Sequence, residues 1–479
     1  MRPSLRLPAA LVLPVLVAAQ GVPPGVPKGL PRVVSLTVAA TDSKGAPASG
    51  LTEADFQITD AGKPRSLSFV RPVPEPLALA VAPGQSTNRT TNSTRPVTVL
   101  LLDQLNAAVS ERTANANHAL RELSKVPGNG QVFAFILSSE GRLVPIRGLP
   151  GTVPGKSETD GDDAWTAQGA AMLEKGMRDS ARIRTASLDM SMRIQWTLNA
   201  LESLANQMAV FPGRKGLVWF SAGMPLSIAP QVTSTGATLD FTPQLLHLAH
   251  TFDRAATSVY PVRLGATGEE DSLEVVAQLT GGVPPGDRDI APTLRQAISD
   301  ARGSYQLAFL PPDDNWDGGF HKLRVASARK GVRVRTKAGY YAFPDAGEAE
   351  VTEALRAMLA DPSDRAGICL RGEIVAGPKP RLSVRIGTAD IALARQGARR
   401  SAQLRLVLSI TMSDGRVVLS PVLRIEPEWG EEQAVAVVRD GIPFDQEIAT
   451  AGIDKIRVAV YDRGSGVGGS LTLHEHAQR

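Results

Sequence analysis

Asp103, Ser138 and Ser221 each follow directly after an apolar run of the kind that forms a buried strand. In a parallel sheet the carboxyl ends of the strands lie along one edge, and ligands bind in the crevice beyond that edge. We therefore expect these three side chains to share an edge of one sheet. A carboxylate and two hydroxyls offer oxygen atoms there for hydrogen bonds with a ligand.

Ser221 is also the residue to consider as a nucleophile, because it follows a strand. Its surroundings, Phe-Ser-Ala-Gly-Met, do not match the Gly-x-Ser-x-Gly turn, and no histidine and aspartate partners can be placed beside it. Cys369 is the single cysteine and is read as a small buried apolar residue. His247 and His250 have a spacing that suits joint metal ligation on a helix, but the apolar stripe beside them favours surface histidines. The sequence therefore predicts that the chain is not an enzyme.

The elements that must position these residues alternate between strands and helices over residues 97–345. Apolar runs at 97–102, 132–137 and 217–220 predict strands that are buried on both faces. Helical spacing of apolar residues recurs between them, including a helical insertion at about 150–210. We therefore predict an α/β fold, with a doubly wound, mostly parallel, Rossmann-like sheet.

The flanking segments have different patterns. Residues 33–81 alternate as a small β module, 346–362 form a bridging helix, and 363–479 predict a β-sandwich of short strands. Residues rich in proline and glycine predict linkers at 20–32 and 82–96. Within the second of these linkers, two asparagines match the N-glycosylation triplet, Asn88 and Asn92.

The N-terminus and the composition indicate where the chain acts. Residues 1–19 carry two arginines, an apolar stretch and a small-residue end, which together are typical of a signal peptide. The stretch is too short to span a membrane. The 52 basic and 48 acidic side chains nearly balance, which argues against a nucleic-acid-binding protein. We expect a periplasmic or secreted protein that is not an integral membrane protein after signal cleavage.

Several stretches resemble the von Willebrand factor type A-related proteins typical of acidobacteria. They are 98–107, 212–225, 258–265 and 303–342, preceded by 50–70. They occur in the same order as in that family, whose members are exported and mostly uncharacterised. The resemblance implies a type A-like domain over residues 97–345, and it says much less about activity.

In the wider type A superfamily, the resemblance implies a divalent cation such as Mg²⁺ held by an Asp-x-Ser-x-Ser motif after the first strand. This sequence keeps the aspartate as Asp103 but has Leu105 and Ala107 in place of the two serines. Asn106 offers an amide oxygen one residue out of register, and the loop at Ser221 has no carboxylate. These departures predict a degenerate metal site without a cofactor. The alternative is that Asp103 still binds Mg²⁺.

The function predicted is an exported protein-binding or adhesion-type module whose partner is another protein of unknown identity. Its recognition surface is expected at five rim residues, together with the insertion: Asp103, Gln104, Asn106, Ser221 and Gly223. Three alternatives stay open. The chain is a divalent-cation-dependent adhesion protein that uses Asp103, an envelope structural protein, or a hydrolase acting on envelope polymer.

Overall fold

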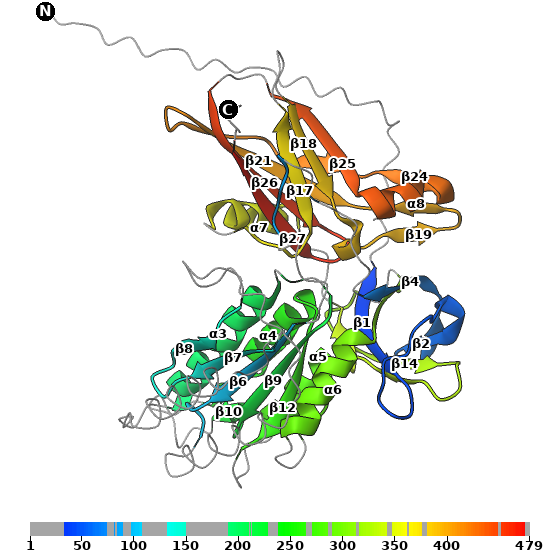
Figure 1. Ribbon diagram of the computed structural model, residues 1–479, viewed down its shortest axis with the longest axis vertical. Helices are drawn as coiled ribbons and strands as arrows, with labels where there is room; N and C mark the ends of the chain where they lie inside the picture. Colours follow the sequence, from blue (N-terminus) through cyan, green and yellow to red (C-terminus); the bar gives the residue numbers. More distant parts are fainter. Residues whose placement is uncertain are drawn as a thin grey trace, which may run out of the picture. The chain divides into compact units, whose positions relative to one another are not determined.

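The computed structural model describes residues 33–73, 81, 84–89, 97–107, 132–149, 190–209, 211, 213–228, 238–264, 271–285, 290–312, 316–342, 347–361, 364–375, 381–448 and 452–474 (Figure 1). The predicted signal peptide, the linker at 20–32 and residues 150–189 of the predicted insertion lie outside these ranges. Within them, no helix is both long enough and apolar enough to cross a membrane.

One sheet combines four parallel strands with a fifth, antiparallel strand, in the order β12-β9-β6-β7-β8. The bounds are β6 Thr98–Asp103, β7 Val132–Leu137, β8 Leu143–Arg147, β9 Lys215–Ser221 and β12 Thr257–Arg263. Every residue of β6, β7 and β9 is buried, which explains their continuous apolar runs. The strands predicted at 97–102, 132–137 and 217–220 are thereby confirmed.

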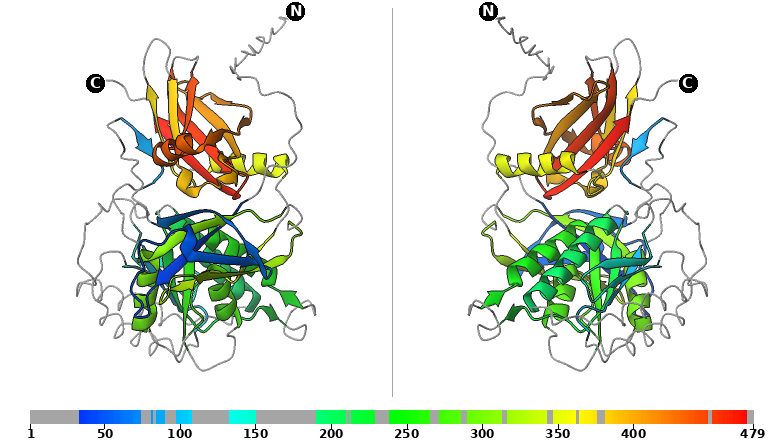
Figure 2. Two further views of the ribbon diagram at one scale, coloured as in Figure 1. Left: turned by 90° about the vertical axis from the view of Figure 1, so that its right-hand side faces the viewer. Right: turned by 90° about the vertical axis from the view of Figure 1, so that its left-hand side faces the viewer.

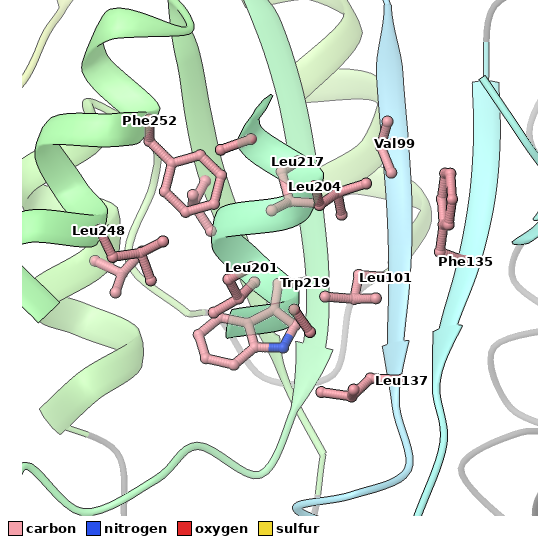
Figure 3. Packing of buried hydrophobic residues seen from close by; sticks show 14 of the residues in the cluster. Val99, Leu101, Phe135, Leu137, Leu201, Leu204, Leu217, Trp219, Leu248 and Phe252 are labelled. Carbon is pink, nitrogen blue, oxygen red and sulfur yellow. The ribbon is translucent and has the colours of Figure 1, made fainter. Parts of the chain in front are cut away.

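Helices pack against both faces of this sheet. Alternate residues of the strands contact α3 (Met190–Ala209), α4 (Thr242–Arg254) and α5 (Asp271–Thr280) on one face. The intervening strand residues contact α6 (Ile290–Arg302) on the other. Figure 3 shows the first of these cores, where Leu201 and Leu204 of α3 lie against Trp219 of β9 and Leu101 of β6.

Strands from the two ends of the region 33–342 pair with each other. Antiparallel pairing gives two four-stranded sheets, β15-β1-β13-β4 and β16-β14-β2-β3. The bounds are β1 Val34–Thr41, β2 Phe56–Asp60, β3 Lys63–Arg65, β4 Leu67–Val73, β13 Ser304–Phe309, β14 Phe320–Ser327, β15 Arg333–Arg335 and β16 Gly339–Tyr341. These two sheets share one apolar core, so residues 34–73 and 304–341 form a single β body.

The C-terminal residues form further antiparallel sheets around a core of their own. One sheet has the order β25-β18-β17-β5, and another joins β22, β21, β26 and β27, with β23 also paired to β21. The bounds are β5 Ser86–Thr87, β17 Leu370–Val375, β18 Arg381–Ile386, β21 Leu404–Met412, β22 Val417–Leu419, β23 Leu423–Ile425, β25 Ile442–Glu447, β26 Ile453–Asp462 and β27 Val467–His474. A small third sheet contains β19 Ala394–Gln396, β20 Arg399–Ser401 and β24 Glu428–Gly430. Helix α7 (Glu348–Ala360) packs on β21 and β26, and α8 (Glu431–Asp440) follows β24 (Figure 2).

The predicted fold class, an α/β fold with a doubly wound, mostly parallel sheet, is wrong. Of the described residues, 44% lie in strands and 26% in helices. The described ranges contain six α-helices and several antiparallel sheets. Two features of the pairing explain the error. Strand β8 turns back on β7, and the strands after residue 303 leave the parallel ladder to pair with residues 34–73. Pairing over such long separations leaves no trace in local sequence patterns.

Candidate functional site

The candidate site lies where β6 and β9 end side by side. Leu102 of β6 is paired with Phe220 of β9, so Asp103 and Ser221, each one residue further on, are neighbours at the carboxyl ends of the two strands. The sequence predicted this juxtaposition from the apolar runs before each residue. The side chains of Asp103 and Ser221 are both fully buried.

The carboxylate of Asp103 accepts three hydrogen bonds from its own chain. The backbone N–H of Asn106 donates to Oδ1 over 2.9 Å. The side-chain amide of Asn106 donates to Oδ2 over 2.7 Å, and the Ser221 hydroxyl donates to the same oxygen over 2.6 Å. Both carboxylate oxygens are therefore engaged, and the turn after β6 is fastened to the end of β9.

A second set of contacts fixes the groups that hold Asp103. The amide of Asn106 also donates to Thr197 Oγ1 of α3 over 2.9 Å. Ser221 Oγ accepts the backbone N–H of Gly223 over 3.0 Å. Gly223 has a φ of 84°, a left-handed conformation that glycine adopts without strain. The network thus joins β6, β9, α3 and the loop after β9.

The electrostatics of Asp103 are those of a buried acid. Burial raises the pKa of Asp103, and the hydrogen bonds from Asn106 and Ser221 oppose that shift. The indole N–H of Trp219 lowers the same pKa, although it does not reach normal hydrogen-bond geometry. These causes include no charged group, so hydrogen bonds alone oppose the effect of burial on the pKa of Asp103.

Other polar atoms nearby make no hydrogen bond within the described ranges. They are both amide atoms of Gln104, Oδ1 of Asn106 and the hydroxyl of Ser139. All three side chains are buried. Gln104 is fixed through its backbone instead, since its N–H donates to the carbonyl of Leu137 over 2.9 Å.

A magnesium ion does not fit the described residues as they stand. Leu105 and Ala107, on either side of Asn106, are buried apolar residues whose side chains offer no oxygen ligand. Both oxygens of Asp103 already accept hydrogen bonds, and Ser221 Oγ is committed to Asp103 and Gly223. No group of three or more His, Cys, Asp or Glu side chains capable of holding a metal occurs in the described part of the chain.

The structure brings Asp103, Asn106, Ser221 and Gly223 into one network and places Gln104 beside it. Ser138 follows Leu137, which pairs with Asp103, so it lies on the same edge of the sheet as predicted. Its hydroxyl is not part of the network, because it accepts the backbone N–H groups of Glu140 and Arg142 in the turn between β7 and β8. The five predicted recognition residues are all buried. The side chains of three of them, Asp103, Asn106 and Ser221, are joined to one another by hydrogen bonds.

Two residues of the site were not predicted. Thr197 is a buried polar residue within the apolar stripe of α3, and this break in the stripe was the available signal. Ser272, at the start of α5, accepts the backbone N–H of Met224 over 3.0 Å and so fixes the loop after β9. No local pattern of the sequence points to Ser272.

The other residues considered for chemistry are placed apart from this network. His247 is exposed, and its Nε2 lies 3.6 Å from Oε1 of Glu202 in α3. Cys369 is buried, as predicted, and burial raises the pKa of its thiol. Neither arrangement provides a nucleophile with a base beside it.

Comparison with known proteins gives little further information. No family model matches the chain, and no curated protein matches it. Among solved structures, the chain is similar to proximal thread matrix protein 1 from the mussel byssus, with 15% identity and a TM-score of 0.27. That match covers 43% of this chain, which spans about half of the mussel protein, 48%. A similarity this low supports no conclusion about fold or function.

Proposed function

We propose that the chain is an exported protein-binding module, not an enzyme, and that it binds through the rim at the ends of β6 and β9. The observation that carries the proposal is the hydrogen-bonded carboxylate of Asp103. Three donors from the chain itself hold the rim in one conformation. A preorganised rim loses little conformational entropy when a partner binds.

The accessible part of this rim is the loop after Ser221. Pro225 and Leu226 are half-buried, and Ser227 is exposed as the first residue of β10 (Ser227–Ile228), which pairs with β11 (Leu239–Asp240). The network beneath positions this loop through Gly223 and Met224. The resemblance to exported type A-related proteins supports the same assignment and a periplasmic or secreted location.

A capture experiment with matched variants tests the proposal. Three baits are each used in a periplasmic extract: the purified chain, its rim variant Ser227→Arg, and a control, Glu53→Arg, at an exposed residue of the short 3-10 helix before β2. We expect one protein to be retained by the wild type and the control and lost from the rim variant. Equal retention by all three baits would remove the rim from the binding surface.

A second candidate is a cation-dependent adhesion protein. The observation in its favour is that Asn106 Oδ1 and Gln104 Oε1 lie in the same buried site without a hydrogen-bond partner in the described ranges. Calorimetric titration of the wild type and Asp103→Ala with Mg²⁺, Mn²⁺ and Ca²⁺ separates the two candidates. Heat from the wild type that disappears in the variant establishes the cation site, and no heat from the wild type excludes it.

The hydrolase alternative has no structural support at Ser221. Its hydroxyl donates to Asp103 directly, without an intervening histidine to act as the base. Ser221 is also fully buried, and we assign its pairing with Asp103 to positioning the loop after β9.

A further inference from the structure

Residues 85–89 cross from the N-terminal part of the sequence to the edge of a C-terminal sheet. Their strand, β5, pairs with β17, with Thr87 opposite Arg371 and Ser86 opposite Gly372 (Figure 1). The sequence predicted a linker over 82–96. The structure instead gives almost every residue of this segment a specific partner about 280 positions further along the chain.

The side chain of Asn88 forms hydrogen bonds with three backbone groups. Its side-chain N–H groups donate to the carbonyls of Arg365 and Ile368, each over 2.8 Å. Its side-chain oxygen accepts the N–H of Leu370 over 2.8 Å. This combination of two donors and one acceptor selects asparagine over aspartate, which has no N–H to donate. It also commits the amide nitrogen that an N-linked glycan would occupy.

Arg89 is bound by charge and by carbonyl oxygens. Its guanidinium lies 2.9 Å from the carboxylate of Asp390 and donates to the carbonyl of Ala366 over 2.8 Å. The side chain of Arg89 is only 9% exposed. Arg89 is desolvated and paired with a carboxylate, and the side chain of its neighbour Asn88 is fully hydrogen-bonded. A peptide with other residues at these two positions should therefore bind to this sheet edge much more weakly.

The rest of the segment is held in the manner of an added strand. Thr87 Oγ1 donates to the carbonyl of Leu370 over 2.9 Å, and the Gln85 amide donates to Glu373 over 3.0 Å. Backbone pairing at a sheet edge combined with side-chain pockets is a general mode of peptide recognition. The site therefore has both elements of a sequence-specific peptide groove.

We propose that the edge of β17, the carbonyls of residues 365–368 and Asp390 form a peptide-binding site that accepts an extended Ser-Thr-Asn-Arg segment, filled in cis by residues 85–89 and in trans by the same segment of a second copy of this chain. The proposed occupant is a second copy, because it carries the same Ser-Thr-Asn-Arg sequence that the groove binds in cis. The contacts above are all with residues distant in sequence, so they are the same whichever copy supplies the segment. Covalent linkage favours the cis arrangement at low concentration, and exchange increases as the chain concentration approaches the effective local concentration.

A labelled peptide with the sequence of residues 84–90 tests the groove by fluorescence anisotropy. The full-length variant Asn88→Ala/Arg89→Ala weakens the cis segment and leaves the groove unchanged. We expect this variant to bind the peptide at least tenfold more tightly than the wild type does. Asp390→Ala added to it, or Asn→Asp in the peptide, should weaken binding at least tenfold. Equal binding of the two peptides, or no binding to a variant that keeps its circular dichroism spectrum, overturns the proposal.

Disulfide trapping tests the occupant and does not depend on the double variant folding. In a Cys369→Ala background, Thr87→Cys and Arg371→Cys are introduced either together in one chain or separately in two chains that are mixed. The doubly substituted chain should close an internal disulfide, because positions 87 and 371 are paired. The mixed chains should form a disulfide-linked heterodimer whose yield rises with concentration. Internal closure without any heterodimer at millimolar concentration refutes exchange between copies.

Discussion

The substitution Asp103→Ala tests the network at the rim most directly. It removes the acceptor of the Asn106 backbone N–H and of the Ser221 hydroxyl, both of which are buried. The Asn106 side chain keeps its bond to Thr197. Each buried donor left without a partner costs about 1–3 kcal/mol, so two donors predict a loss of about 2–6 kcal/mol in the stability of this region.

Hydrogen exchange followed by mass spectrometry is the appropriate assay, because a chain with several cores need not unfold in a single step. Peptides covering 98–107 and 215–228 should exchange faster in Asp103→Ala, while peptides from the C-terminal sheets should not change. The control Asp454→Ala alters an exposed aspartate and should change the local stability by less than about 0.5 kcal/mol. Unchanged exchange at both rim peptides in Asp103→Ala would refute the reasoning.

The pH dependence of the same region has a definite sign. Because burial raises the pKa of Asp103 above its ordinary 3.8, the folded state retains the proton to higher pH than the unfolded state does. The contribution of Asp103 to stability is therefore full below about pH 4 and decreases as pH rises through the folded pKa. Asp103→Asn cannot titrate and should lack this dependence in the same exchange experiment. A wild-type rim that becomes more stable with rising pH would contradict the assignment.

Three further predictions concern residues outside the rim. Burial lowers the pKa of Lys215 to about 7, so the free energy of unfolding in urea should rise with pH above about 7, by about 1.4 kcal/mol per pH unit at most. The variant Lys215→Met should lack this slope, and a parallel slope in both proteins would refute the prediction. A Cβ at Gly282 would lie 1.8 Å from the carbonyl oxygen of Val259, so Gly282→Ala should lower the melting temperature by several degrees. The control Gly347→Ala, whose Cβ would meet no atom within 4 Å, should leave it unchanged. Equal melting temperatures of the two variants would contradict the prediction. The variant Arg214→Met removes the donors to the carbonyls of Thr37 and Gly281, and it should lower the free energy of unfolding in urea by about 2–4 kcal/mol. A change below about 1 kcal/mol would show that these hydrogen bonds contribute little.

The sequence was informative wherever burial leaves a local pattern. A six-residue apolar run predicted β6, and the residue after it was correctly placed at the strand end beside Ser221. Each of these inferences depends only on which residue types lie next to one another along the chain.

The failures involve pairing between distant residues. The alternation in 34–41 predicts a strand equally well whether its partner is a neighbouring hairpin or residues 304–309, and the structure has the second arrangement. Residues 85–89 are polar and flanked by prolines, so they were assigned to a linker although β17 binds them. The roles of Thr197 and Ser272 likewise depend on which loop the tertiary structure brings against each helix.

The pairing of Val34 with Phe309 also determines the order in which the chain can fold during synthesis. The ribosome completes β1 early, yet its central neighbour β13 emerges only after β6, β9, β12 and their helices have been made. The nascent chain must therefore carry an apolar strand with open backbone groups through most of translation, and such a strand is prone to mispair. Overexpression should accordingly yield fewer inclusion bodies when a chaperone covers the first forty residues of the β body until β13 has been made.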